Sequence, residues 1–462
     1  MKRIIIACDG TNQYDVLTNV KRICNALSYS SDGIEQLTFY QSGLGPEDLG
    51  SSGFVKAYAQ ALGQEIDWRI EEAYAFIMNN YLPGDEIFFF GFSRGAFVAR
   101  VLANFVARVG IYRNPQYSWD FRLALGAYKD GTLDRDIETH QYDTTQDGEC
   151  VLKVHRVEIE VVGCWDTVTS LGVPWTGSGE VFGGYKHLSP SLVKGIKHAF
   201  QALALDEYRH PFSPTLWFLP EDAEVAKTID LQQCWFPGAH RNTGGGYHDQ
   251  ALADLSFFWI LDRCSQFLAF DPKYIKSVVD THYQPWKLNS NRGRSSRLEH
   301  ADGYDTVYQG WGRGRCYDSY RGGQTWTWKY RIPGAYRGND GETNMTNESI
   351  HPSVRARWQT SREKGGELKD GPSVYAPKAL RGFEPREGAN GNWEWVKREN
   401  GEEVLVIPEE NWNEVLVSLE APFPTWRDFE PKEVGRGKWE WVKENRKEIP
   451  VTLEAPFSTE RL

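Results

Sequence analysis

A serine flanked by glycines is the feature of this sequence best suited to covalent chemistry. Ser93 stands in a G-x-S-x-G pattern that follows an apolar run and opens an amphipathic segment. A strand-to-helix turn of this kind is so tight that the residues two before and two after the serine must be small, and Gly91 and Gly95 meet that need. The turn lifts the hydroxyl to a helix N-terminus, where the helix dipole favours negative charge. We therefore predict that Ser93 is a nucleophile for acyl transfer; the alternative is a tight turn with a buried serine.

Two further residues have the right order along the chain to activate this serine. A serine nucleophile needs a base held by a third group, and in this arrangement the order is Ser, then Asp or Glu, then His. Asp166 follows a β-branched run at 157–162, and His240 follows an apolar run at 231–236. We predict that His240 is the general base and that Asp166 orients it; the alternatives are a turn cap and a surface histidine. Three histidines are weaker candidates, namely His198 in a predicted helix, His210 in a proline-flanked loop and His351 outside the alternating region.

The backbone N–H groups of an oxyanion hole are predicted at two turns. One belongs to Arg94, the residue after the nucleophile. The other comes from the turn after the first strand, at Gly10 or Thr11, where Gly10 allows close backbone approach. Asp9 in that turn could instead cap the following helix. The turn is also similar to the D-x-D-G-T opening of haloacid-dehalogenase-type phosphohydrolases, but Ala7 occupies the nucleophile position, so phosphoaspartate chemistry fails.

Strand-like and helix-like segments alternate over the first 270 residues. The pattern predicts strands at 3–8, 37–41, 87–90, 157–162, 216–219 and 231–236, and helices at 19–29, 54–81, 94–109, 192–205 and 247–267. Such alternation is typical of a doubly wound, mainly parallel α/β sheet. Residues 110–153 and 167–190 are too long for ordinary connections and are candidate lids or substrate walls. The Gly-, Arg- and aromatic-rich stretch 289–339 is expected to wrap the core.

An internal repeat marks the C-terminal region. Phe-Glu-Pro, Trp-Glu-Trp-Val-Lys and Leu-Glu-Ala-Pro-Phe each occur twice, at 383–385 and 429–431, 393–397 and 439–443, and 419–423 and 453–457. Tryptophans two residues apart on a strand share one face, so we predict two small antiparallel β units at 383–423 and 429–457. We expect both to pack on the main domain through buried tryptophans and to take no part in catalysis. An exposed aromatic shelf would instead indicate a binding surface.

Composition narrows the class of protein. The formal net charge of −11 argues against a nucleic-acid partner, because binding to a phosphate backbone needs a basic surface. The seven cysteines contain no C-x-x-C pair, which predicts reduced thiols and no zinc site. No apolar run reaches the ~20 residues of a membrane span, and the N-terminal run is too short for a signal peptide. We expect a cytoplasmic protein with no metal or organic cofactor.

Several stretches together resemble the catalytic domains of type VI secretion phospholipase effectors, a family formerly of unknown function with members in fungi and in bacteria outside secretion systems. The matching stretches are 8–11 (CDGT), 91–96 (GFSRGA), 165–168 (WDTV), 171–174 (LGVP), 202–207 (ALALDE), 235–247 and 350–355 (IHPSVR). The resemblance implies an α/β-hydrolase fold, hydrolysis of lipid esters, and a triad of Ser93, Asp166 and His240. Two departures affect substrate fit, since Asn12 stands where the family usually has Trp, and Arg241 where it often has Ser.

The resulting hypothesis is a serine hydrolase with a catalytic domain at 1–360 and the repeats within 361–462. Its substrate is a small-molecule or lipid ester, phospholipid included, with transient contact to a membrane surface. The competing hypothesis is a catalytically silent α/β-hydrolase scaffold whose aromatic C-terminal units bind a glycan or a protein. One distance separates them: the Ser93 hydroxyl and the His240 ring lie within roughly 2.6–3.2 Å in an enzyme and beyond about 8 Å in a scaffold. The oligomeric state is left open.

Overall fold

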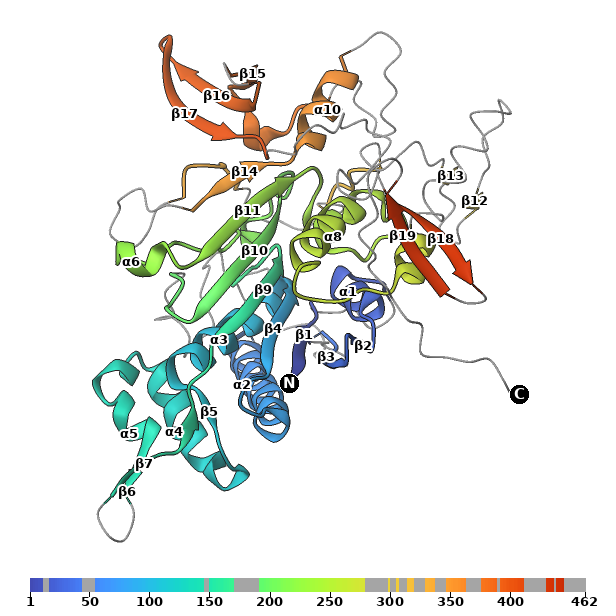
Figure 1. The fold of residues 1–462 in the computed structure, drawn as a ribbon. Coiled ribbons are helices and arrows are strands. Elements are labelled where there is room, and N and C mark those ends of the chain that lie inside the picture. Colours follow the sequence, from blue (N-terminus) through green and yellow to red (C-terminus); the bar gives the residue numbers. More distant parts are fainter. Residues whose placement is uncertain are drawn as a thin grey trace.

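The computed structural model describes residues 1–10, 16–43, 55–144, 149–169, 191–278, 298–299, 305–306, 314–319, 329–336, 346–362, 375–388, 391–410, 429–435 and 438–443. Its centre is a sheet of order β14-β11-β10-β9-β4-β1-β3-β2 (Figure 1). These strands are β1 (Lys2–Cys8), β2 (Ser30–Ser31), β3 (Ile34–Gln41), β4 (Glu86–Phe92), β9 (Ile159–Trp165), β10 (Ile196–Ala204), β11 (Asp230–Phe236) and β14 (Glu348–Ile350). All neighbours pair in parallel except β2 and β3. The predicted mainly parallel sheet is confirmed.

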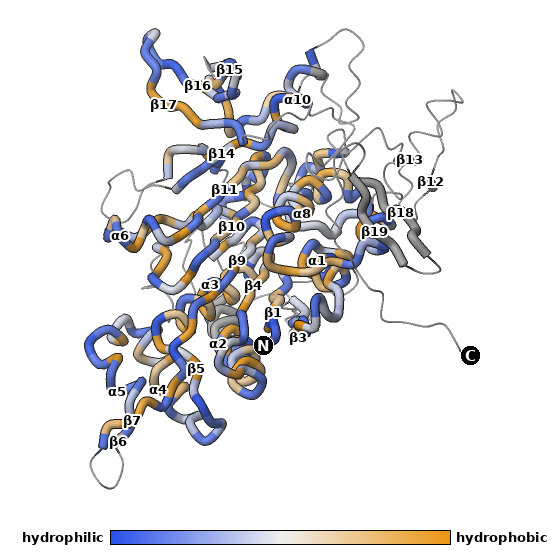
Figure 2. Tube along the Cα trace, viewed as in Figure 1, coloured by the Kyte–Doolittle hydropathy of each residue, from blue (hydrophilic) through white to orange (hydrophobic). Residues whose placement is uncertain are grey.

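Helices cover both faces of this sheet. The main ones are α1 (Asn19–Ala26), α2 (Val55–Asn80), α3 (Ser93–Val109) and α8 (Ala251–Cys264). Successive side chains of a strand point to opposite faces, and in β1 Ile4 and Ile6 pack with α2 and α3, whereas Ile5 packs with α1 and α8. A strand covered on both sides must be apolar at every position, and Figure 2 shows hydrophobic residues concentrated along the central strands.

Two segments differ from the sequence-based prediction. Residues 192–205 were expected to be helical, but Ile196–Ala204 form β10, which is hydrogen-bonded between β9 and β11. Pairing on both sides outweighs the local helix preference of an Ala- and Leu-containing segment, so His198 lies on a strand. The predicted strand at 216–219 is also wrong, since its only strand-type contact among the described residues is an isolated bridge from Phe218 to Ser191.

The first predicted lid lies at the far end of the sheet. Residues 110–153 contain β5 (Ile111–Tyr112), α4 (Ser118–Lys129), α5 (Ile137–Gln141), β6 (Tyr142–Thr144) and β7 (Cys150–Leu152). The Phe121 ring of α4 stacks on Tyr74 of α2 at 4.1 Å. The segment runs from the C-terminal end of α3 to the N-terminal end of β9, which is the edge opposite to Ser93, so this packing does not favour a lid over Ser93. Residues 170–190 of the second predicted wall lie outside the described residues.

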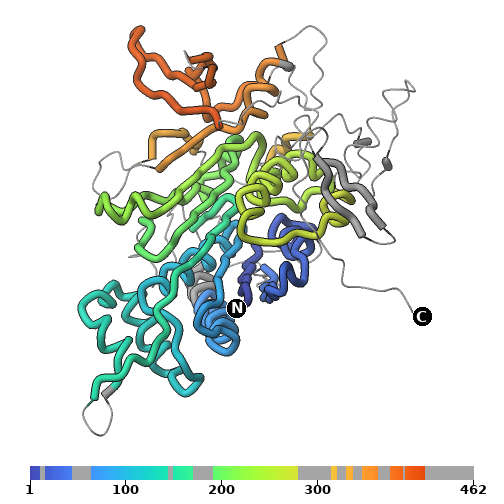
Figure 3. The backbone as a smooth tube through the Cα atoms, viewed as in Figure 1, coloured from blue at the N-terminus to red at the C-terminus, as the bar shows by residue number. Residues whose placement is uncertain are grey.

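The repeats form antiparallel β units with one register. The first copy is β15 (Phe383–Glu387), β16 (Trp393–Glu399) and β17 (Glu402–Pro408), and the second contains β18 (Phe429–Gly435) and β19 (Lys438–Lys443). Pro385 pairs with Trp395 in the first copy, and Pro431 pairs with Trp441 in the second. Antiparallel pairing is thus confirmed for these strands, while residues 411–428 and 444–457 lie outside the described part. Figure 3 shows the orange first copy beyond β14, at one edge of the central sheet.

One tryptophan anchors this first copy. Trp395 is 0% exposed, in a cluster with Leu203 of β10 and Ile350 of β14. Its ring meets Trp358 of α10 (Pro352–Thr360) edge-on, with ring centroids 6.4 Å apart. The structural interpretation of the repeat tryptophans therefore holds for Trp395.

Replacing this anchor should destabilise the protein. The substitution Trp395→Ala removes a fully buried ring and is expected to lower the free energy of unfolding by about 3–5 kcal/mol. The measurement is denaturant unfolding followed by circular dichroism. Trp119→Ala is the control, because Trp119 is 67% exposed and a surface change costs about 0.5 kcal/mol or less. Equal unfolding curves for both variants would contradict the anchoring role.

Candidate active site

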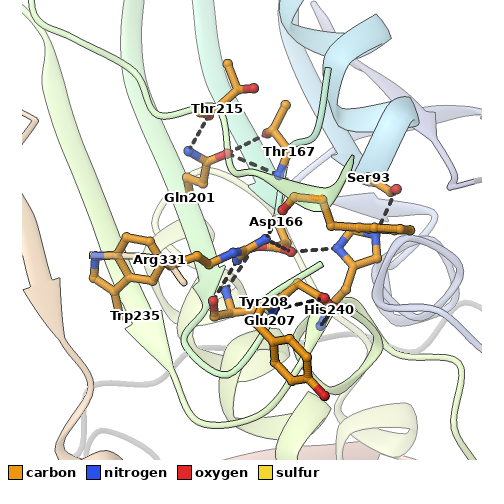
Figure 4. Close-up of polar contacts among 12 residues, drawn as sticks. Ser93, Asp166, Thr167, Gln201, Glu207, Tyr208, Thr215, Trp235, His240 and Arg331 are labelled. Atoms are coloured by element: carbon orange, nitrogen blue, oxygen red, sulfur yellow. Dashed lines mark hydrogen bonds and ion pairs between the residues drawn. The ribbon is translucent and has the colours of Figure 1, made fainter. Parts of the chain in front are cut away.

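The three side chains predicted to do chemistry meet at the carboxyl edge of the sheet (Figure 4). Ser93 begins α3 directly after β4, Asp166 follows β9, and His240 begins α7 (His240–Gly244) after β11. Parallel strands end at the same edge, so residues far apart in the chain are brought together there. All three are buried, with exposed fractions of 6%, 0% and 4%.

The turn that carries Ser93 requires its two predicted glycines. A Cβ atom on Gly91 would lie 2.5 Å from the Cα of Ala96, and one on Gly95 would lie 2.3 Å from the carbonyl oxygen of Cys8. Real side chains cannot approach the backbone so closely, so only glycine fits at both places. Ser93 itself has φ of 59°, a left-handed conformation that is uncommon outside glycine. The packing of α3 against β1 and β4 therefore holds this serine in a strained turn.

His240 bridges the other two side chains. Its Nδ1 lies 2.6 Å from Asp166 Oδ2, and its Nε2 lies 2.8 Å from Ser93 Oγ. An ionised carboxylate only accepts hydrogen bonds, so Nδ1–H donates to Asp166 and Nε2 is left to accept from the Ser93 hydroxyl. The ring lies near those of Phe92 and Phe212, with centroids 4.7 Å and 5.0 Å away. This arrangement can move a proton from the hydroxyl to the imidazole.

Asp166 has a second side-chain partner, Arg331, that the sequence did not reveal. Arg331 donates from Nη1 to Oδ1 at 2.5 Å and from Nη2 to Oδ2 at 3.0 Å. The backbone N–H of Ala204 donates to Oδ1 at 2.9 Å, and Asp166 has φ of 45°. Arg331 falls in the aperiodic stretch 289–339, where no spacing marks one arginine over another; the only hint was the expectation that this stretch wraps the core.

These contacts set the charges of the site. Burial alone would raise the pKa of Asp166, but the Arg331 guanidinium and the hydrogen bond from His240 outweigh it and hold that pKa at about 2. Burial lowers the pKa of His240 below its usual 6.5, against the opposing effect of Asp166. At neutral pH the site therefore pairs an ionised carboxylate with a neutral imidazole that is able to accept a proton.

Glu207 fixes the backbone beneath the histidine. Its carboxylate accepts from Nε and Nη2 of Arg209, both at 2.9 Å, and from the His240 backbone N–H at 3.3 Å. The Arg209 guanidinium in turn lies 3.7 Å from the centre of the Phe212 ring. The sequence motif at 202–207 included Glu207 but pointed to no role for it.

The predicted oxyanion hole is only partly visible. Arg94 lies in the first turn of α3, where backbone N–H groups have no acceptor within the helix. A Cβ on Gly10 would come within 3.1 Å of the Ser93 Cβ, so the turn does touch the nucleophile. The Gly10 N–H, however, donates to Asp9 Oδ1 at 2.7 Å, and Thr11 lies outside the described residues. A second donor in this turn stays a prediction.

Other candidates lie elsewhere in the fold. His198 is on β10 and 3.3 Å from Asp230, and the side chain of His351 accepts from the Ser353 N–H at the start of α10. Within the described ranges, no group of three or more His, Cys, Asp or Glu side chains could hold a metal ion. No helix in the same part of the chain combines the length and apolar character needed to cross a membrane.

Comparison with known proteins finds a match to one protein family. A family model for the catalytic domain of Tle1-like phospholipase effectors of the type VI secretion system matches residues 2–263. An uncharacterized protein of Saccharomyces cerevisiae is 30% identical over an alignment of 251 residues that covers 50% of this chain and 35% of that protein, so the chain spans about a third of its length.

Two solved structures are also similar in part. A crystal structure of an uncharacterized Pseudomonas aeruginosa protein is 14% identical, with 59% of this chain and 48% of that chain covered and a TM-score of 0.30. The structure of the Tle1 effector bound to the VgrG spike of the type 6 secretion system is 21% identical, with 54% and 52% covered and a TM-score of 0.29.

The tight turn at Ser93 can be tested through stability. Gly95→Ala should lower the free energy of unfolding by at least about 2 kcal/mol, because its methyl group would overlap backbone atoms of β1. Gly126→Ala in α4 is the control, since nothing lies within 4 Å of that position and alanine favours a helix by about 0.5–1 kcal/mol over glycine. Thermal unfolding of both variants checks this; an unchanged melting temperature for Gly95→Ala would argue against the turn described.

Proposed function

This chain belongs to the family of Tle1-like type VI secretion phospholipase effector catalytic domains, and we propose that it hydrolyses carboxylic esters of lipids, phospholipids included. Ser93 is the nucleophile, His240 the general base, and Asp166 the acid that orients the imidazole. The observation that carries this proposal is the pair of His240 hydrogen bonds, 2.8 Å to Ser93 Oγ and 2.6 Å to Asp166 Oδ2. The order of the parallel strands, with Ser93 at a strand-to-helix turn, supports an α/β-hydrolase fold.

The first half of the reaction forms an acyl-enzyme. Ser93 Oγ attacks the ester carbonyl carbon while its proton passes to His240 Nε2. The carbonyl oxygen becomes negatively charged, and the Arg94 N–H together with a second donor from the turn at Gly10 and Thr11 stabilises that charge. The protonated imidazole, held by Asp166, then gives its proton to the departing alkoxide as the ester C–O bond breaks. The alcohol leaves, and the acyl group stays on Ser93.

The second half returns the enzyme to its starting state. A water molecule loses a proton to His240 Nε2 and attacks the acyl carbon. The second tetrahedral intermediate collapses, the bond to Ser93 Oγ breaks, and the proton on His240 returns to that oxygen. The products are a carboxylic acid and an alcohol, and no cofactor takes part.

We assign the catalytic unit to residues 1–360 and the repeats to 361–462. β14 belongs to the central sheet, and α10 follows it directly. The backbone of the first repeat meets β14 through a bridge between Ile350 and Glu409 and a hydrogen bond from Glu410 N–H to the Ile350 carbonyl. The first repeat thus lies against the β14 edge of the sheet, which supports a role for it outside the chemistry.

A catalytically silent scaffold is less well supported. A scaffold leaves the histidine remote from the serine, whereas His240 Nε2 is 2.8 Å from Ser93 Oγ. An aromatic binding shelf needs exposed rings, whereas Trp395 is buried against the main domain. Both observations favour the hydrolase.

The proposal predicts the effect of removing the nucleophile. Purified protein should hydrolyse members of a panel of phospholipid, triacylglycerol and short-chain esters, and Ser93→Ala should lower kcat by at least ~10³-fold. Release of fatty acid or alcohol is the measurement, expressed per folded molecule.

A matched serine provides the control. Ser353 is buried and its Oγ lies 2.7 Å from His351 Nδ1, but it belongs to α10 and has no proposed part in the chemistry. Ser353→Ala should keep the wild-type kcat per folded molecule. An undiminished rate for Ser93→Ala, or no turnover of any ester by wild type, would contradict the proposal.

A further inference from the structure

Arg331 reaches Asp166 from outside the part of the chain that the family model matches. That match ends at residue 263, whereas Arg331 lies on the described segment 329–336. The two side chains are 2% and 0% exposed, and both nitrogens of the guanidinium fork contact the carboxylate. The same guanidinium donates to the carbonyl oxygens of Ala204 and Phe212, both at 2.6 Å. The Arg331 guanidinium therefore makes four hydrogen bonds, two to the Asp166 carboxylate and two to backbone carbonyl oxygens.

A buried carboxylate needs a cation. Removing an ionised acid from water costs several kcal/mol unless a counter-charge and hydrogen bonds replace the water. His240 is neutral before reaction and supplies one hydrogen bond without a charge, so the cation in direct contact with Asp166 is Arg331. A planar, permanently charged guanidinium also sets the direction of the carboxylate, because two parallel hydrogen bonds restrict its rotation.

The charges around Asp166 show why Arg331 is needed for charge balance. Among the residues that the structure describes, the titratable and charged groups that face His240 and Asp166 are Glu207 and Arg209 after β10, and Arg331 and Tyr336 on the 329–336 segment. Glu207 pairs with Arg209 at 2.9 Å, which leaves Arg331 to balance Asp166. Without Arg331 the buried group would carry one excess negative charge beside the imidazole.

We propose that Arg331 is a positioning residue for ester hydrolysis, which holds Asp166 ionised and aimed at His240 so that the imidazole is neutral and correctly oriented when the serine reacts. This inference rests on the proposed function. Arg331 touches neither Ser93 nor the reacting atoms and acts through Asp166.

The segment that carries Arg331 has other anchors. The Lys329 N–H donates to the Tyr208 carbonyl at 2.9 Å, and the Gly334 N–H donates to Glu348 Oε2 at 2.8 Å. The Tyr336 ring stacks on Trp235 of β11, with centroids 6.0 Å apart. Because these contacts do not involve the guanidinium, the segment can keep its place when the charge of residue 331 is removed.

The test compares a neutral and a charged replacement. Arg331→Gln keeps hydrogen-bonding groups but loses the charge, and Arg331→Lys keeps the charge but loses the fork. For Arg331→Gln we expect kcat to fall about tenfold or more with KM within about threefold of wild type, because the loss is in the transition state. The excess negative charge should raise the proton affinity of His240, whose pKa is lowered by burial in wild type. The acid limb of kcat/KM should therefore move to higher pH, by about one pH unit. Arg331→Lys should keep the wild-type limb and recover part of kcat.

A matched arginine controls for the loss of a buried ion pair. Arg22 pairs with Asp254, with side chains 2% and 0% exposed, on the α1 and α8 side of the sheet. Arg22→Gln should lower stability without moving the acid limb of kcat/KM. An acid limb that moves equally in Arg22→Gln and Arg331→Gln would overturn the proposal, as would an Arg331→Gln limb identical to wild type.

A titration of His240 separates this inference from the proposed function. Its pKa can be followed by NMR in histidine-labelled protein, without any substrate. If wild type hydrolyses no ester, the proposed function fails, while a raised His240 pKa in Arg331→Gln but not in Arg331→Lys still supports the charge assignment. An unshifted pKa in Arg331→Gln would overturn it. Unfolding of both Arg331 variants would also overturn it, since Arg331 would then serve the fold rather than Asp166.

Discussion

The carboxylate of Asp166 is fully buried and accepts hydrogen bonds from His240, Arg331 and the Ala204 N–H. A buried acid is stable only with partners of good geometry, so the elements that supply them must all be in place at once. Those elements are β9, the end of β10, the start of α7 and the 329–336 segment. The orientation of the imidazole toward Ser93, and with it the proposed chemistry, depends on this one group.

The sheet explains why the parts meet where they do. From β1 the chain first adds β3 on one side of it, and then adds β4, β9, β10 and β11 in turn on the other side. The direction of strand addition therefore reverses at the boundary between β1 and β4. A parallel sheet leaves a crevice at such a switch point, and Ser93 follows β4 there, against the Asp9-Gly10 turn that follows β1. Ser93 and Asp166 both have positive φ, and such strain persists only where the surroundings enforce it, as at many functional sites.

Local patterns were enough to single out Ser93, Asp166 and His240, which the structure brings into hydrogen-bond contact, because each has a short signature beside a strand. The spacing of Gly91 and Gly95 around Ser93 indicates a tight turn. The order of Ser93, Asp166 and His240 along the chain indicates that they lie at the same edge of the sheet. Features that depend on tertiary contacts could not be predicted from the sequence. β10 looks helical until β9 and β11 pair with it, and Arg331 is one arginine among many in an aperiodic stretch whose place is decided by tertiary contacts. Glu207 was visible as part of a motif, but its contact with the His240 backbone needed the fold.

The proposed chemistry requires that His240 and Asp166 make Ser93 a nucleophile. The most direct measurement is reaction of the purified protein with a fluorophosphonate, followed by mass spectrometry of the intact chain and of its peptides. An activated serine displaces fluoride and keeps the phosphonyl group on its oxygen. If His240 activates Ser93, the expected result is one adduct per chain, located on Ser93, and a much slower reaction in His240→Ala. An adduct on another residue, or a chain that hydrolyses esters while Ser93 stays unmodified, would contradict it.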